Sequence, residues 1–156
     1  MGHKKRLVKE IEGVLLTPLK IINVDNGNVL HGLKMGGDGF CGFGEAYFSI
    51  VKGGAIKAWK RHRKMTLNLM VPLGAIKFVV YDDRMGSSTY RCFQEILLSR
   101  DNNYMRITVP PLVWLGFQGC NEGENMLLNI ADFLHDPDEV DRKLLQQIDY
   151  DWGVNR

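Results

Sequence analysis

The sequence has 156 residues, which suits one domain with a core of its own that needs neither a disulfide nor a metal ion for stability. Its 20 basic and 18 acidic side chains are mixed along the chain and leave a formal charge of +2, which argues against a nucleic-acid-binding protein. No apolar run approaches the roughly 18 residues of a membrane span, and the N-terminus lacks the apolar core of a signal peptide. We therefore expect a cytoplasmic protein with one domain over residues 1–156.

The cysteines agree with a cytoplasmic location. Cys41, Cys92 and Cys120 are an odd number and have no CxxC spacing. This pattern fits reduced thiols with packing roles better than a disulfide framework or a zinc site.

The chain opens with the basic hexapeptide MGHKKR, residues 1–6, which we expect to be a flexible terminus. Strand-like runs then recur about every ten residues. They lie near residues 14–23, 28–35, 44–52, 55–62, 65–72, 75–82, 92–99, 103–109, 113–119 and 125–131. The separators are rich in glycine, asparagine, aspartate and proline, as in turns. Many short strands at this spacing predict an all-β sandwich or barrel.

The end of the chain departs from this rhythm. The segment at residues 135–147 begins with acidic residues and carries Arg142 and Lys143 further along. The dipole of a helix favours this distribution of charge. We therefore predict a short C-terminal helix over residues 135–147 that caps the barrel.

The strand AIKAWKRH, residues 55–62, combines cationic, aromatic and imidazole side chains. Strand alternation divides them into two faces, one with Ile56, Ala58, Lys60 and His62 and the other with Lys57, Trp59 and Arg61. A cation and a titratable ring therefore share one face, two residues apart.

The strand GEAYFSIV, residues 44–51, places an acid, a phenol and a hydroxyl in line. By the same alternation, Glu45, Tyr47 and Ser49 lie on one face. If this face points into a cavity, Tyr47 can return a proton to a substrate. If it points to solvent, Tyr47 has no such role.

A series of segments carries a resemblance that covers most of the chain. They are GFGEAYFS (42–49), GAIKAWKRHRKMTLN (54–68), GAIKFVVYDDR (74–84), VPPLVWLGF (109–117), HDPDE (135–139) and IDYDW (148–152). Through them, the chain from about Gly39 to Trp152 resembles the cupin-type nucleotide-sugar epimerases, that is, the dTDP-4-dehydrorhamnose 3,5-epimerase family and its relatives in surface-polysaccharide pathways. The resemblance implies a cupin jelly-roll β-barrel of two antiparallel sheets with a ligand cavity at one end.

Metal-dependent cupins bind their ion through two histidines on one strand, a nearby glutamate and a later histidine. In this chain the resemblance puts Lys60, His62, Thr66 or Leu67, and Leu115 at those positions. One imidazole cannot hold a transition metal in such a site. We expect no metal ion and no other cofactor.

The resemblance implies proton abstraction from the carbon next to a sugar ketone, followed by reprotonation on the opposite face. The family's histidine base falls at Lys60 and its phenolic acid near Leu128, while the carboxylate partner of the base has no counterpart before residues 148–152. His62 is then the titratable ring, and an imidazole pKa of about 6.5 suits a general base near neutrality. A lysine, with a pKa of about 10.4, fits better as the protonated group that holds the ketone or enolate oxygen.

A second branch, the nucleotide-sugar 3,4-ketoisomerases, resembles the chain at RHRKM and VPPLVW. The RGxHxHK strand of those enzymes aligns with KAWKRHR, so that His62 matches the second histidine and Lys60 replaces the first. The alternative for His62 is a neutral, hydrogen-bonded histidine in the barrel mouth. The alternative for Lys60 is a salt-bridged or phosphate-binding lysine.

Chemistry and the resemblance together suggest further substrate-binding residues, namely Lys57, Trp59, Asn68, Arg84, Trp114 and Glu45. Cationic side chains suit a diphosphate, tryptophan rings can stack on a base or sugar, and an amide can bind a sugar hydroxyl. Some of these residues have an alternative role that is equally open. Arg84 can form an ion pair with a neighbouring aspartate, the tryptophans can occupy core positions, and Asn68 can simply be a polar residue of its strand.

We therefore predict a metal-free cupin that binds a nucleotide-diphosphate sugar and epimerises a 4-keto sugar through His62, with help from Lys60 and Tyr47. The first alternative is a 3,4-ketoisomerase, and the second is a non-catalytic cupin that binds a sugar nucleotide or a partner enzyme. The resemblance also implies a homodimer in which an N-terminal strand crosses to the neighbour. Such pairing would protect the apolar run 14–23, which we expect to be an edge strand.

Overall fold

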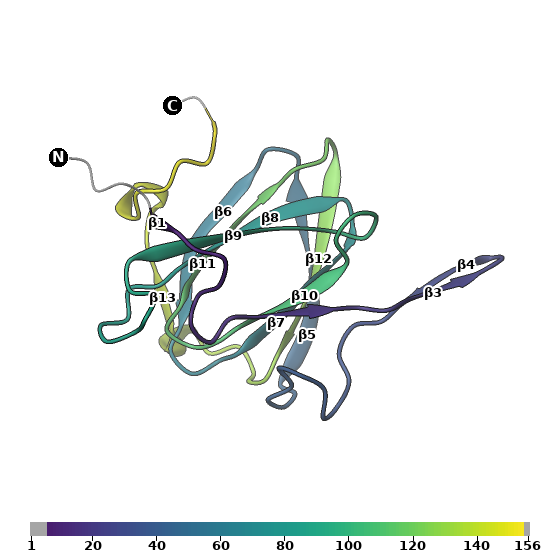
Figure 1. Cartoon of the computed structure of the whole chain (residues 1–156), viewed down its shortest axis with the longest axis horizontal. Coiled ribbons are helices and arrows are strands. Elements are labelled where there is room, and N and C mark those ends of the chain that lie inside the picture. Colours follow the sequence, from purple (N-terminus) through teal and green to yellow (C-terminus); the bar gives the residue numbers. More distant parts are fainter. Residues whose placement is uncertain (1–5, 155–156) are drawn as a thin grey trace.

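The computed structural model describes residues 6–154 and consists almost entirely of β-strands (Figure 1). In chain order the strands are β1 (Arg6–Leu7), β2 (Leu15–Pro18), β3 (Ile21–Val24), β4 (Gly27–Leu30), β5 (Glu45–Lys52), β6 (Ile56–His62), β7 (Leu67–Leu73), β8 (Ala75–Tyr81), β9 (Cys92–Ser99), β10 (Met105–Val109), β11 (Trp114–Gly119), β12 (Glu124–Ala131) and β13 (Val140–Arg142). Short 3₁₀ turns, η1 (Pro137–Glu139) and η2 (Leu145–Gln147), lie on either side of β13. The predicted all-β class is confirmed, and no helix among residues 6–154 is long and apolar enough to cross a membrane.

Two sheets face each other and hold the core between them. One has the strand order β1-β9-β8-β11-β6-β13, and the other has the order β2-β10-β7-β12-β5. In the described strands, the pair β1 and β9 is parallel and the remaining neighbours are antiparallel. From β5 onward the chain passes repeatedly between the two sheets, which is the connectivity of a jelly roll.

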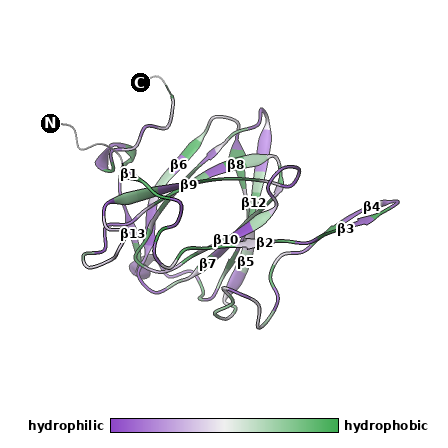
Figure 2. Ribbon diagram, viewed as in Figure 1, coloured by the Kyte–Doolittle hydropathy of each residue, from purple (hydrophilic) through white to green (hydrophobic). Residues whose placement is uncertain are grey.

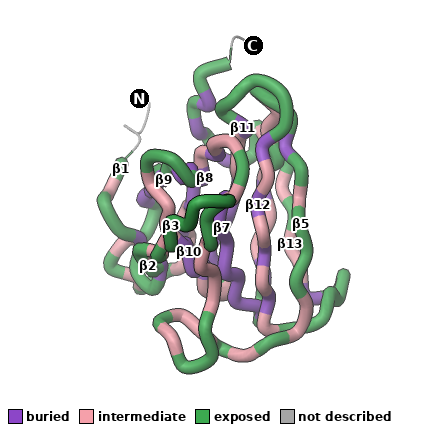
Figure 3. The backbone as a smooth tube through the Cα atoms, turned by 90° about the vertical axis from the view of Figure 1, so that its right-hand side faces the viewer, coloured by how far each residue is buried: buried purple, intermediate pink, exposed green. Residues whose placement is uncertain are grey.

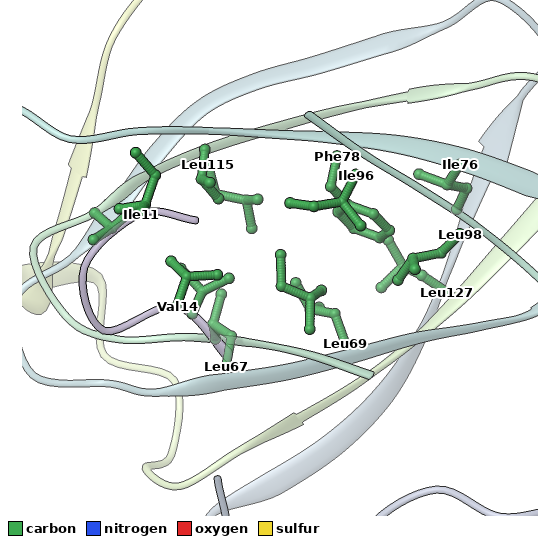
Figure 4. Close-up of a cluster of buried hydrophobic side chains, with 14 of the residues drawn as sticks. Ile11, Val14, Leu67, Leu69, Ile76, Phe78, Ile96, Leu98, Leu115 and Leu127 are labelled. Carbon is green, nitrogen blue, oxygen red and sulfur yellow. The ribbon is translucent and has the colours of Figure 1, made fainter. Parts of the chain in front are cut away.

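The alternation of side chains along each strand builds the core. Ile76 and Phe78 of β8 point toward the five-stranded sheet, and Leu69 of β7 and Leu127 of β12 point back at them (Figure 4). Figure 2 shows hydrophobic residues interspersed with hydrophilic ones along these strands. The apolar residues therefore gather between the sheets, where their removal from water stabilises the fold.

The C-terminal segment covers the outer face of the six-stranded sheet. Ile148, Tyr150 and Trp152 are buried there against Trp59 and Phe93. The Trp59 and Trp152 rings lie 5.4 Å apart, centre to centre. The middle of this sheet is therefore buried on both faces, which explains why β8 reads as a nearly continuous apolar run.

The predicted helix over residues 135–147 is wrong. The segment forms η1, then β13, then η2, and it contains no α-helix. Val140, Asp141 and Arg142 pair with the free edge of β6, so their backbone groups are satisfied across the sheet rather than along a helix. Helical charge preference is a weak local term, and this tertiary pairing overrides it.

The N-terminal strands lie at the edges of the fold. β2 is the outer strand of the five-stranded sheet, as expected for the run 14–23, but that run breaks after Pro18. β3 and β4 then form a two-stranded ribbon that projects from the barrel (Figure 1). Most of the ribbon is exposed, whereas β12 is largely buried or intermediate (Figure 3). Of the predicted flexible terminus, residues 1–5 lie outside the described residues, and Arg6 is instead paired with Cys92.

A bulge in β6 turns Lys57 toward the interior. Leu115 pairs with Lys60 and Phe117 pairs with Lys57, so β6 has one more residue than β11 between these two pairs. The extra residue interrupts the strict alternation that predicted opposite faces for Lys57 and Lys60. That prediction is wrong for Lys57, because both lysines line the same cavity.

Gly116 of β11 lies opposite this bulge, where there is no room for a side chain. A Cβ atom there would lie 2.7 Å from Ala58 Cβ and 3.0 Å from the Trp152 ring. We expect Gly116→Ala to lower the free energy of unfolding in urea by about 1–3 kcal/mol, the usual cost of overpacking. Measured in an Ala58→Gly background, the cost should be smaller, and an equal cost in both backgrounds would contradict this contact.

Candidate active site

A cavity of about 620 Å³ opens between the two sheets at one end of the barrel. Its apolar wall includes Leu67, Leu69, Leu115, Phe117 and Leu127. Its polar and charged lining includes Tyr47, Ser49, Lys57, Lys60, His62, Asn129 and Arg142. A volume of this size, with a few polar groups on an apolar wall, is typical of small-molecule sites.

His62 ends β6 and is only 5% exposed. Its Nδ1 makes a short hydrogen bond to Oε1 of Glu139, and an ionised carboxylate can only accept, so Nδ1 carries the proton. Nε2 is therefore the basic nitrogen, and it has no hydrogen-bond partner among the described residues. His62 is part of the cavity lining, and Nε2 is a buried basic atom that the described residues leave unpaired.

Glu139 is held in place by the turn that follows β6. Its Oε2 accepts the backbone N–H groups of Arg63 and Lys64, each at 3.1 Å, and of Met65 at 3.3 Å. Burial alone would raise its pKa, but the hydrogen bonds from His62 and from these amides outweigh burial and lower the pKa. Glu139 therefore stays ionised and fixes both the tautomer and the orientation of His62.

The protonation state of His62 follows from its burial. Burial lowers its pKa below the ordinary 6.5, and the nearby charge of Lys60 acts in the same direction, although the hydrogen bond that His62 donates to Glu139 opposes them. The imidazole is therefore neutral at pH 7, which is the form that can accept a proton.

Four cationic side chains contribute to the cavity wall, namely Lys57, Lys60, Arg142 and Lys143. Lys57 Nζ donates to the Ile50 carbonyl at 3.1 Å. Lys60 lies directly opposite Arg142 of β13, and neither forms an ion pair with a carboxylate of residues 6–154. Burial first, and then the charge of Arg142, lower the pKa of Lys60. These positive groups make the cavity suited to an anion.

Tyr47 and Asn129 form a pair on the five-stranded sheet. They are directly opposite each other in the pairing of β5 with β12, and Asn129 Nδ2 donates to the Tyr47 hydroxyl at 2.8 Å. Tyr47 is 42% exposed, and both residues line the cavity. The predicted face of Tyr47 and Ser49 therefore points inward, whereas Glu45 is not part of the lining.

Several predicted substrate-binding residues lie outside the cavity. Arg84 Nε donates to Asp82 at 2.8 Å, which is the ion pair that the sequence also allowed. Asn68 uses its amide on Gly39, Arg106 and Thr108. Neither side chain is free to bind a ligand.

The two tryptophans occupy core positions. Trp114 is 2% exposed and donates its indole N–H to Asp83 at 2.9 Å, and it does not line the cavity. Trp59 contributes to the cavity wall, but its ring packs against the C-terminal segment on the outer face. Both rings are therefore structural in this arrangement rather than stacking platforms.

Sequence reasoning missed Glu139, Asn129 and Arg142. The prediction that the base has no carboxylate partner before residues 148–152 is wrong, since Glu139 fills that role for His62. The only signal was the HDPDE motif, but its residues were assigned to a helix. No group of three or more His, Cys, Asp or Glu side chains among residues 6–154 could hold a metal ion.

No family model matches the chain, but solved structures and curated proteins do. The chain is 36% identical to a dTDP sugar isomerase from Desulfovibrio desulfuricans G20, over 93% of this chain and 94% of that one, with a TM-score of 0.88. The chain belongs to the dTDP-4-dehydrorhamnose 3,5-epimerase family and its related sugar isomerases. The predicted family is confirmed.

More distant members of the family agree with this assignment. A probable low-salt glycan biosynthesis epimerase of Haloferax volcanii is 29% identical over 107 residues, which are 68% of this chain and 66% of that protein. A dTDP-4-dehydrorhamnose 3,5-epimerase of Bacillus anthracis, solved with TDP and PPi bound, shares the fold with a TM-score of 0.81 at 20% identity, over 97% of this chain and 91% of that one. The predicted cupin jelly roll is confirmed.

Proposed function

We propose that this protein binds a nucleotide-diphosphate 4-keto sugar and epimerises it at a carbon next to the ketone. The observation that carries the proposal is the buried, neutral His62 in the cavity lining, whose Nδ1 is held by Glu139 while the basic Nε2 has no hydrogen-bond partner among residues 6–154. A histidine oriented by a carboxylate is a general base that needs no metal ion.

In the first step, His62 Nε2 takes the proton from the carbon next to the ketone. The imidazolium that forms is stabilised by the ionised Glu139. The electron pair of the broken C–H bond moves onto the ketone oxygen, where the Lys60 ammonium donates a hydrogen bond. Its lowered pKa makes this ammonium a stronger donor to the developing enolate.

In the second step, Tyr47 returns a proton to the same carbon. His62 lies on the six-stranded sheet and Tyr47 on the five-stranded sheet, so they approach a sugar from opposite walls. Proton removal from one face and return to the other inverts the carbon. Tyr47 is exposed enough to regain its proton from water.

The cations of the cavity lining account for the diphosphate. Lys57 and Arg142 line the cavity and have no carboxylate in an ion pair among residues 6–154. Phosphate oxygens are the natural partners of such groups. Relatives solved with dTDP or TDP bound support a nucleotide of this kind.

The test is incubation with dTDP-linked 4-keto sugars in heavy water. We expect loss of a C3 or C5 proton signal together with an inverted product, both followed by NMR. Absence of exchange on every such sugar, despite measurable binding, would leave only a sugar-nucleotide-binding protein.

A 3,4-ketoisomerase is the second candidate. A dTDP sugar isomerase is among the most similar relatives. In addition, the resemblance to the 3,5-epimerases places Lys60 at the position of their histidine base. Such an enzyme moves the carbonyl and leaves a 3-keto product. Product NMR separates the two reactions directly.

Lys60→Met tests whether the Lys60 ammonium stabilises the enolate oxygen. The loss of one donor to the developing oxyanion should slow exchange by about 10²–10³-fold, with a much smaller effect on the affinity for dTDP. Lys52→Met, on the exposed end of β5, is the matched control and should leave both quantities unchanged. A fall in dTDP affinity that accounts for the whole effect would instead make Lys60 a phosphate-binding lysine.

We also propose a homodimer and a cytoplasmic location. The projecting ribbon exposes Ile22, Val24 and Val29, and a lone two-stranded ribbon is marginally stable in water. A neighbouring protomer would supply a surface against which the ribbon can pack, and sedimentation at micromolar concentration would reveal a monomer if none binds.

The cysteines support the proposed cytoplasmic location, because three free thiols suit a reducing compartment.

A further inference from the structure

Asn129 is a buried polar residue in the cavity wall that the mechanism above does not use. It is only 2% exposed, and its neighbours across β12 are Tyr47 of β5 and Leu69 of β7. Its Nδ2 is bonded to the Tyr47 hydroxyl, but its Oδ1 has no hydrogen-bond partner among residues 6–154. A buried carbonyl oxygen without a partner is uncommon in native proteins and calls for a ligand.

The direction of the hydrogen bond decides what Tyr47 can do. An amide N–H only donates, so the Tyr47 oxygen accepts it with a lone pair. The phenol hydrogen is not used in this bond and is free to point at a substrate in the cavity. When that hydrogen leaves, the same N–H remains to stabilise the phenolate.

The unpaired Oδ1 has a complementary use. It belongs to the amide that contacts the phenol, and the leucines next to it in the wall, Leu69 and Leu127, cannot donate a hydrogen bond, while Ser49 makes none to it. A 4-keto sugar carries ring hydroxyl groups on C2 and C3, and each can donate to such an oxygen. One side chain would then hold both the acid and the sugar.

We propose that Asn129 is a positioning residue, which keeps the Tyr47 proton free for the carbon and binds a substrate hydroxyl through Oδ1. The inference rests on the proposed function. In the step it serves, the Tyr47 O–H bond breaks, a C–H bond forms with the enolate electron pair, and the ketone is restored. The phenolate then takes a proton from water.

The experiment measures exchange and inversion separately in heavy water. In Asn129→Asp the new carboxylate accepts the phenol hydrogen and ties it up. We expect deuterium to enter the unchanged substrate through His62 within a few-fold of the wild-type rate, while inversion falls at least about 10-fold, as in Tyr47→Phe. Asn102→Asp, on an exposed turn, is the matched control and should change neither rate.

Asn129→Leu keeps the test valid if the buried carboxylate prevents folding. It should lower the ratio of inversion to exchange in the same way, and it should weaken binding of a dTDP-linked 4-keto sugar by about 10-fold without weakening dTDP itself. Equal losses of exchange and inversion, or equal losses for both ligands, would mean a purely structural role and overturn the inference. If the wild type binds the sugar nucleotide but shows no exchange, the proposed reaction fails, whereas the binding comparison still decides the hydroxyl contact.

Discussion

Replacing His62 with asparagine should reduce solvent exchange next to the ketone by about 10²–10⁴-fold, the contribution of a positioned general base. The asparagine side chain reaches about as far as Nδ1 of the imidazole ring, but it provides no basic atom at the position of Nε2. The affinity for dTDP should change little, because the diphosphate is assigned to Lys57 and Arg142. Proton NMR in heavy water and calorimetric titration with dTDP measure the two quantities.

His31→Asn is the control for this substitution, since His31 lies outside the cavity lining. It should exchange at the wild-type rate. If His62→Asn exchanges at the wild-type rate, His62 is not the base, and Lys60 becomes the candidate base.

Replacing Glu139 with glutamine should reduce exchange by about 10²–10⁴-fold while leaving the base itself in place. Glutamine has the same shape, but it cannot stabilise the imidazolium, and its amide nitrogen can force the wrong tautomer on His62. Three backbone N–H groups that now bind Oε2 would also lose a charged acceptor. Asp138→Asn, the exposed neighbour, should exchange normally, and a wild-type rate in Glu139→Gln would show that His62 needs no oriented partner.

The pH dependence of the exchange rate tests the coupling between His62 and Glu139 independently. Burial lowers the pKa of His62, so the acid limb of the exchange rate should lie below pH 6.5, while Glu139 raises that pKa in opposition. Glu139→Gln should therefore move the acid limb to still lower pH. An acid limb that does not move would contradict the coupling.

The same pKa shifts affect the stability of the fold. The folded-state pKa values of His62 and Glu139 both lie below their ordinary 6.5 and 4.5. The contribution of the two groups to stability is therefore complete above those values and is lost on acidification.

The candidate base and acid could be selected from sequence because strand alternation is local. Alternation groups His62 with Lys60 and Tyr47 with Ser49, and the structure shows that both groups line the cavity, which the sequence leaves open for Tyr47. Lys57 could not be placed, because the bulge that turns it inward depends on how β6 pairs with β11. The sequence allows Arg84 either a phosphate-binding role or an ion pair, and its contact with Asp82 decides for the ion pair.

Glu139 illustrates the limit of local patterns. It is 77 positions away from His62 along the chain, and the two meet only because residues 140–142 pair with the edge of β6. The charges around Glu139 favour a helix locally, and nothing in that segment encodes the free strand edge that competes for its backbone. Asn129 was missed for the same reason, since its partner Tyr47 is 82 positions away.

The amino-acid sequence alone determined the strand rhythm, the all-β class, the family and which residues share a strand face with His62 and with Tyr47. These follow from period-two alternation, turn residues and motif order, which are all written within short stretches of the chain. The tertiary structure alone decided the partner of His62, the direction of Lys57, the course of residues 135–147 and the pairing of Asn129 with Tyr47. Each of these depends on which distant strand edge or side chain is available after the sheets have closed, and no local pattern carries that information.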